Sequence, residues 1–106
     1  MKNYDVALQT SGPRAQLLGS RAVCAAKLGQ FAQAREDIAE ALALEPNTSS
    51  LLFSAAKVHA LAADREACYE YVKRALAANF PRAEFHRDIA FSALHNDPTF
   101  RGLLEG

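Results

Sequence analysis

The chain has 106 residues, enough for one domain, and its 12 basic and 12 acidic side chains give it no formal net charge. A balanced charge argues against general binding to nucleic acids or anionic membranes, because such binding depends on an excess of Lys and Arg. No apolar run reaches the roughly 18 residues that a membrane span needs. Two cysteines are too few for a disulfide framework, so a reducing cytoplasm is the expected location.

A repeat of 34 positions organises the chain. The pairs Ala7-Leu8, Ala41-Leu42 and Ala75-Leu76 fall on this spacing. An apolar residue precedes the Ala of each pair by three positions: Tyr4, Ile38 and Val72. A fixed period of this length is typical of stacked helical hairpins, each of which buries its apolar face only against its neighbours. We therefore expect an all-α chain that functions through the surface of the stack.

The first three expected helices occupy residues 1–11, 14–28 and 31–44. Residues 1–11 match the second helix of a hairpin whose first helix is missing, and Gly12-Pro13 is expected to end this helix because proline lacks an amide donor. Gly29 ends the next helix, since glycine readily adopts the left-handed backbone of a helix stop. The chain thus starts within a repeat, which indicates either a longer array or an exposed end that something else covers.

The second hairpin repeats this scheme. Pro46 ends the preceding helix, and the polar residues after it offer N-caps for a helix over residues 50–62. Asp64 is placed to cap the following helix, residues 65–79, and Pro81 closes the unit. Two full hairpins are therefore expected to follow the initial half repeat.

After Pro81 the 34-residue period fails and a shorter pattern replaces it. Residues 88–94 and 97–103 both read D-x-x-F-x-x-L, nine positions apart. Each Asp can cap a short helix, and Pro98 suits a first helical turn. The Phe and Leu of each copy lie one turn apart on the same helix face. Residues 82–106 are therefore expected to form two or three short helices that cap the last hairpin.

These residues resemble the tetratricopeptide repeat family. With Pro46 on the family's terminal proline, the first repeat starts at Ala15. Several characteristic slots of the family are then matched: Gly29, Phe31, Ala34, Ile38 and Ala41-Leu42. Ala63 and Arg65 depart from the family's Gly and aromatic slots in the second repeat. Residues 96–104 also look like the ending common to bacterial arrays of this family.

The resemblance implies a right-handed solenoid of helical hairpins with short C-terminal capping helices. Its expected divisions are a half repeat, two full repeats and a helical cap: residues 1–12, 15–48, 49–81 and 82–106. The resemblance also implies a protein–protein interaction module that holds a peptide or partner helix in a concave groove, formed by the first helix of each hairpin. The candidate partner-binding residues are Val23, Lys27, Phe53, Lys57, Leu61 and Arg87.

An apolar floor with basic edges, formed by these side chains, suits an acidic or amphipathic peptide, because burial supplies affinity and charge supplies orientation. The alternative interpretation is that Phe53 packs inside the hairpin and the lysines are ordinary surface. A rival function is self-assembly as a homo-oligomer: the helix of residues 1–11 would expose Tyr4 and Leu8, and uncapped repeat ends tend to stack or swap. A third is an inert spacer in a longer regulator.

The sequence gives only weak indications of a catalytic or metal-binding site. Cys68 takes a small buried slot of the repeat, and His59 fills the slot of a packed Tyr. His86 and His95 are nine positions apart, too far for two metal ligands on one helix face. An acidic cluster is interpreted as a solvated helix face: Glu36, Asp37 and Glu40. The sequence has no Gly-rich phosphate loop, nucleophile motif or metal-ligand Cys spacing, so neither an enzyme nor a cofactor is expected.

Overall fold

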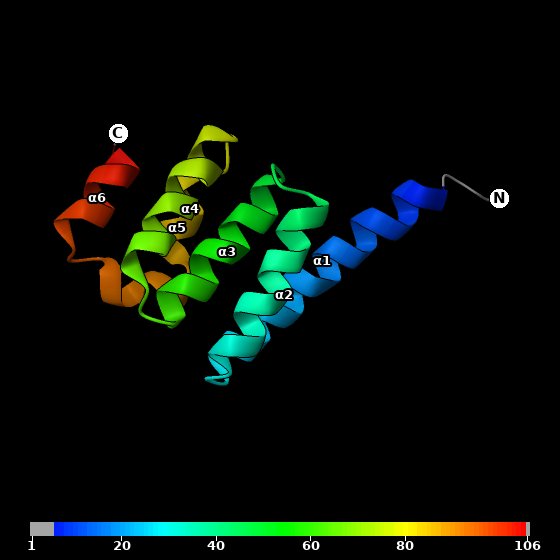
Figure 1. Cartoon of the computed structure of the whole chain (residues 1–106). Coiled ribbons are helices and arrows are strands. Elements are labelled where there is room, and N and C mark those ends of the chain that lie inside the picture. Colours follow the sequence, from blue (N-terminus) through cyan, green and yellow to red (C-terminus); the bar gives the residue numbers. More distant parts are fainter. Residues whose placement is uncertain (1–5, 106) are drawn as a thin grey trace.

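The computed structural model describes the backbone of residues 6–105 and the side chains of residues 14–105. Over this part the regular elements are all helices, as the repeat predicts. The elements in chain order are α1 (Val6–Lys27), α2 (Phe31–Leu44), α3 (Ser49–Leu61), α4 (Arg65–Ala77), α5 (Arg82–Arg87), the 3-10 helix η1 (Ile89–Leu94) and α6 (Pro98–Glu105). Figure 1 shows α1 to α4 side by side, followed by the short elements at the C-terminal end. The molecule measures 50 × 29 × 20 Å, the elongated shape of a row of helices.

The helix α1 differs from the prediction. It runs without interruption from Val6 to Lys27, so the predicted helix end at Gly12-Pro13 is wrong. A proline removes one backbone hydrogen bond and a glycine lowers helix propensity, but neither prevents a helix when the turns on both sides continue in helical form. Tyr4 and the side chain of Leu8 lie outside the described residues, so their predicted exposure stays a prediction.

The turns after α1, α3 and α4 share one backbone geometry. Gly29, Ala63 and Asn79 have positive φ angles of 83°, 63° and 69°. The amide after each of them donates to the carbonyl five positions back: Gln30 to Ala25 at 2.8 Å, Asp64 to His59 at 2.9 Å and Phe80 to Ala75 at 3.0 Å. This is the Schellman motif, whose left-handed residue is usually glycine. The predicted stop at Gly29 is confirmed, and Ala63 adopts the same conformation despite its Cβ.

The two hairpins pack together through α3, which contacts both α1 and α2. The approach is close, since a Cβ at Gly19 would lie 2.8 Å from Cδ2 of Leu51. Nearby, Gln16 Nε2 donates to Ser50 Oγ at 3.3 Å. Gln16 and Ser50 are 34 positions apart, so these equivalent positions of the two repeats are neighbours in space.

The core changes in character along the row of helices. Between the hairpins it is lined largely by alanine, which lets helix backbones lie close together. At the C-terminal end it is aromatic, with Phe85, Phe91 and Phe100 completely buried. These three side chains come from α5, η1 and α6. The predicted C-terminal cap (residues 82–105 in the structure) is therefore part of the core.

The two D-x-x-F-x-x-L copies dock in the same way. In each, Oδ1 of the aspartate accepts a hydrogen bond at 2.9 Å from the amide two positions later. The second carboxylate oxygen pairs with a basic residue of the second hairpin: Asp88 with Lys57 at 3.2 Å and Asp97 with Arg65 at 2.9 Å. The predicted caps at Asp88 and Asp97 are confirmed, and each carboxylate also ties the C-terminal cap to the hairpin below it.

Candidate functional site

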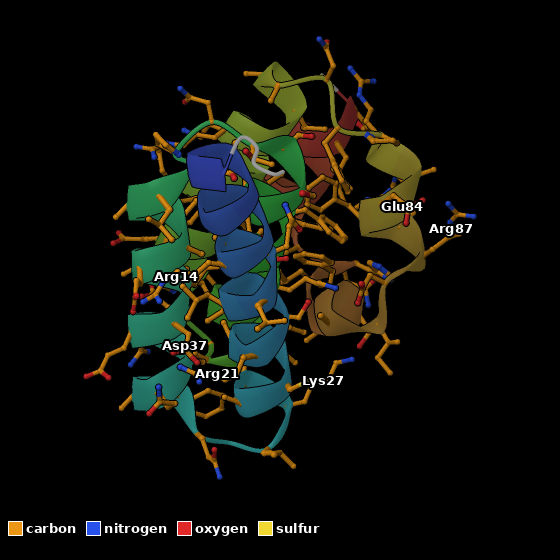
Figure 2. The ribbon with its side chains drawn as sticks, turned by 90° about the vertical axis from the view of Figure 1, so that its right-hand side faces the viewer. Arg14, Arg21, Lys27, Asp37, Glu84 and Arg87 are labelled. Carbon is orange, nitrogen blue, oxygen red and sulfur yellow. The ribbon has the colours of Figure 1, made fainter. Side chains whose placement is uncertain are left out.

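The candidate partner-binding residues lie on α1, α3 and α5, and they do not form one open surface. Val23 and Phe53 are buried. Lys27 and Arg87 are exposed, and Leu61 is half-buried against the core. Arg87 forms an ion pair within its own helix. Figure 2 shows Lys27 near one end of α1 and Arg87 on the outer side of α5.

Phe53 lies at the centre of an aromatic cluster. Its ring stacks on that of Phe80 with 4.4 Å between centroids and meets Phe85 edge-on at 4.9 Å. The ring of Phe91 lies 5.7 Å away. Aromatic pairs at such separations are stabilising beyond the area that they bury. Phe53 is therefore a core residue that the C-terminal cap covers, which agrees with the alternative interpretation of this side chain.

Lys57 also faces the C-terminal cap. Its Nζ lies 3.2 Å from Oδ2 of Asp88 and 4.9 Å from the centroid of the Phe53 ring. The ammonium group thus combines an ion pair with a cation–π contact. Because Asp88 balances its charge, Lys57 attracts an acidic partner less than the sequence predicts.

A strip of exposed polar side chains runs along α1 and reaches the first turn of α3. It carries exposed polar side chains of both helices: Gln16, Ser20, Lys27 and Ser50. We call this strip the α1–α3 face. Its three α1 residues and Val23 follow the spacing i, i+4, i+7 and i+11, so they share one side of the helix. In the part of the chain that the structure describes, Lys27 makes no ion pair, and its charge is the one that this face offers to a partner.

A charged contact between α1 and α2 goes beyond the sequence predictions. Arg21 Nε and Nη2 donate to the two carboxylate oxygens of Asp37 at 2.9 and 2.8 Å, and Gln33 Nε2 donates at 3.0 Å. Figure 2 shows Arg21 and Asp37 turned toward each other between the helices. Asp37 is only 2% exposed, so its interpretation as part of a solvated face is wrong, whereas Glu36 and Glu40 are exposed. The hydrogen bond from Arg21 lowers the pKa of Asp37 and raises that of Arg21.

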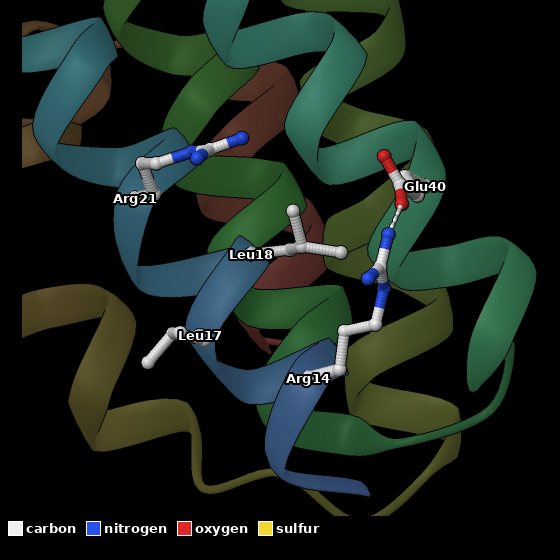
Figure 3. A pocket seen from close by; sticks show the side chains of 5 residues that line it. All are labelled: Arg14, Leu17, Leu18, Arg21 and Glu40. Carbon is white, nitrogen blue, oxygen red and sulfur yellow. Dashed lines mark hydrogen bonds and ion pairs between the residues drawn. The ribbon is translucent and has the colours of Figure 1, made fainter. Parts of the chain in front are cut away.

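Beside this contact, a shallow hollow of about 220 Å³ opens between α1 and α2. Its lining residues are Arg14, Leu17, Leu18, Arg21 and Glu40. Figure 3 shows Arg14 reaching across to Glu40, with which it forms an ion pair, and Leu17 on the far side of α1 from that pair. The pairs Arg14–Glu40 and Arg21–Asp37 follow the antiparallel order of a hairpin.

The surroundings of Cys68 and His59 are those of packed side chains. Cys68 is fully buried, which confirms its predicted place in a small core slot, and burial raises the pKa of its thiol to about 12. The His59 ring stacks on that of Tyr71 with 5.5 Å between centroids. No described residue provides a hydrogen-bond partner for its buried Nδ1. Burial lowers the pKa of His59, because it disfavours the charged imidazolium.

Within the described residues, no three His, Cys, Asp or Glu side chains are grouped to hold a metal ion. No helix of the described chain combines the length and hydropathy needed to cross a bilayer. Comparison with protein-family models, curated proteins and solved structures gives no match to this chain. Its function therefore has to be inferred from the fold and from the surfaces described above.

Proposed function

We propose that the chain is a repeat of the tetratricopeptide type: a right-handed solenoid of two full hairpins and a C-terminal cap. The 34-residue period supports this proposal, and so does the shared Schellman geometry at Gly29 and Ala63, which are 34 positions apart. Further support comes from the hydrogen bond between Gln16 and Ser50. In a stack of repeats, equivalent positions of neighbouring units lie side by side.

The proposed role is non-catalytic binding of a protein partner, in the cytoplasm, on the α1–α3 face. The observation that carries this role is the exposed polar strip that runs along α1 to the first turn of α3, with the charge of Lys27 unbalanced by the described residues. Interfaces of transient complexes are about as polar as ordinary protein surface, and charge at their edge directs orientation and association rate. An amphipathic peptide or helix with an acidic residue near Lys27 fits this strip.

A displayed library of random peptides tests this role. We expect the selected peptides to combine acidic and apolar residues, and their affinity to fall about tenfold for Lys27→Glu. The matched control is Lys73→Glu, which changes an exposed lysine of α4 and should leave affinity unchanged. Added salt should weaken binding to the wild-type protein. Equal binding by both variants, or binding that ignores salt, contradicts the role of Lys27, and failure to select any peptide contradicts the binding function.

A second candidate function is self-assembly. Leu17 of α1 and Leu28, which follows the end of α1, are each 74% exposed. Exposed apolar surface at the end of a repeat row favours association with another copy. Light scattering tests this function, and a monomer at high micromolar concentration contradicts it.

A further inference from the structure

The C-terminal cap carries an open hollow of about 370 Å³, a volume within the range of small-ligand sites. Its polar lining side chains are His86, His95, Asn96, Arg101 and Glu105. All five are exposed to solvent. Figure 1 shows α6 and α1 at opposite ends of the row of helices. We call this site the cap hollow, and it is separate from the α1–α3 face.

The packing of the cap brings together side chains that are separated in the sequence. His86 lies in the last turn of α5, and His95 caps the end of η1. Arg101 and Glu105 belong to α6, where a spacing of four positions places them on one side of the helix. The spacing of His86 and His95 excludes two ligands on one helix face, but both line the same hollow because they come from different elements.

Buried contacts fix the walls of the cap hollow. The rings of Phe91 in η1 and Phe100 in α6 are stacked with 5.7 Å between centroids, and both side chains are fully buried. The His95 ring lies against Phe100, with 6.4 Å between centroids. At the start of α6, Oδ2 of Asp97 accepts a hydrogen bond from the Tyr69 hydroxyl at 2.5 Å, which ties α6 to α4. A site with fixed walls loses little free energy to ordering when a ligand binds.

The lining side chains of the cap hollow are mainly hydrogen-bond donors. Arg101 forms no ion pair with any residue that the structure describes. The imidazoles of His86 and His95 and the amide of Asn96 are further donors. Glu105 is the one acidic group of the lining, and it balances one positive charge. Imidazoles take up protons between about pH 5 and 8, so each histidine adds positive charge in that range.

This set of side chains fits an anion better than a metal ion. The two histidines and Glu105 are not grouped to hold a metal. We propose that the cap hollow binds a phosphate group, with Arg101 as the principal donor and His86 and His95 as further donors. A phosphate dianion offers several acceptor oxygens to donors from different elements, and charge-assisted hydrogen bonds are strong. The phosphate is either free or carried by a phosphorylated partner, since both present the same oxygens.

An NMR titration of the full chain with inorganic phosphate, at constant ionic strength, tests the site. We expect saturable shifts concentrated in residues 86–105. Arg101→Ala should raise the dissociation constant about tenfold, and His86→Ala should also raise it. The matched control is Arg35→Ala, which changes an exposed arginine of α2 and should leave binding unchanged. Shifts that spread over all exposed basic residues without saturation, or equal effects of Arg101→Ala and Arg35→Ala, overturn the site.

Sulfate tests the role of the two histidines, because it keeps both negative charges throughout the range in which imidazoles titrate. Its binding should strengthen as the pH falls from about 8 to 5.5, and this dependence should disappear when His86→Ala and His95→Ala are combined. Lys27→Glu should bind sulfate as the wild-type protein does, so failure of this site and failure of the α1–α3 face are distinguishable. An affinity that ignores pH, or a dependence that persists in the double variant, overturns the part given to the histidines.

A phosphoserine peptide distinguishes the two sources of the phosphate group. Tighter binding of this peptide than of inorganic phosphate assigns the site to a phosphorylated partner, and equal binding assigns it to free phosphate. The same peptide without its phosphate is the control and should not bind the cap hollow. Equal binding of the two peptides overturns the phosphate group as the ligand.

Discussion

Lys57 and Asp88 form an ion pair with 3.2 Å between Nζ and Oδ2, and it joins α3 to the residue that caps the start of η1. The lysine belongs to the helix side that the sequence analysis predicts to face a partner. The carboxylate belongs to the C-terminal cap, which also covers Phe53. On α3, the cap therefore occupies the place where a ligand is expected. The open part of the predicted groove is the α1–α3 face.

Asp88 has two roles that substitutions can separate. Asp88→Ala removes both the hydrogen bond from the Ala90 amide and the ion pair with Lys57, and we expect it to lower the free energy of unfolding by about 1–2 kcal/mol. Asp88→Asn keeps a capping oxygen and loses the charge, so it should lower that free energy by less than half as much. Urea denaturation measures both. Equal losses would mean that the ion pair, and not the cap, dominates.

Phe53 is expected to contribute stability through the aromatic cluster. Phe53→Ala should lower the free energy of unfolding by about 3–5 kcal/mol, because it opens a cavity among Phe80, Phe85 and Phe91. Phe53→Leu keeps much of the volume and should cause a smaller loss. Thermal denaturation followed by circular dichroism compares the variants. A loss below about 1 kcal/mol for Phe53→Ala would contradict the core position.

Exchanging glycine and alanine at positions 29 and 63 should change the stability in opposite directions. Ala63→Gly should raise the free energy of unfolding by about 1 kcal/mol, because glycine adopts the positive φ of 63° without steric conflict. Gly29→Ala should lower it by about 1–2 kcal/mol, for backbone reasons alone, since a Cβ there meets nothing within 4 Å. The control is Ala62→Gly, whose φ is −81°, and it should not stabilise. Chemical denaturation measures the free energy of unfolding of the three variants. A higher free energy of unfolding for Ala62→Gly would contradict the explanation by backbone conformation.

His59 should make stability depend on pH. Its folded pKa lies below the ordinary value of 6.5 because the imidazole is partly buried, so the unfolded chain takes up the proton first. The contribution of the neutral ring is complete above pH 6.5 and is lost as the pH falls through that value toward the folded pKa. His59→Phe should flatten the pH dependence of the urea midpoint in this range and keep a ring against Tyr71. An unchanged slope in His59→Phe would assign the dependence to other groups.

Arg21 and Arg14 both lie on α1 and form ion pairs with α2, Arg21 with a buried carboxylate and Arg14 with an exposed one. Arg21→Leu leaves the buried Asp37 carboxylate with only the Gln33 hydrogen bond, whereas Arg14→Leu leaves Glu40 exposed to water. The first substitution should therefore lower the urea midpoint several-fold more than the second. The pKa of Asp37, held below 3.8 by Arg21, should rise in Arg21→Leu, so that acid unfolding begins at a higher pH. Equal midpoints for the two variants would contradict the importance of burial.

Local features explain how well the helices could be predicted. The helix over residues 31–44 is confirmed at both ends, and Gly29 and the capping aspartates act as expected, because backbone conformation and capping bonds depend on a few neighbouring residues. Gly12-Pro13 is the exception. There the local preference for a helix end did not prevail, and α1 continues through it.

The sequence by itself determined the helices after Gly29, the 34-residue period and the residues that share each helix side. Only the tertiary structure decided which of those sides are covered. Leu17 and Leu51 occupy the same position of the repeat, yet one is 74% exposed and the other 1%. Asp37 and Phe53 became buried for the same reason, because α1 and the C-terminal cap lie against them. Helical periodicity depends on residues within one or two turns. The burial of a helix side depends on which distant segment packs against it, and only long-range contacts determine that packing.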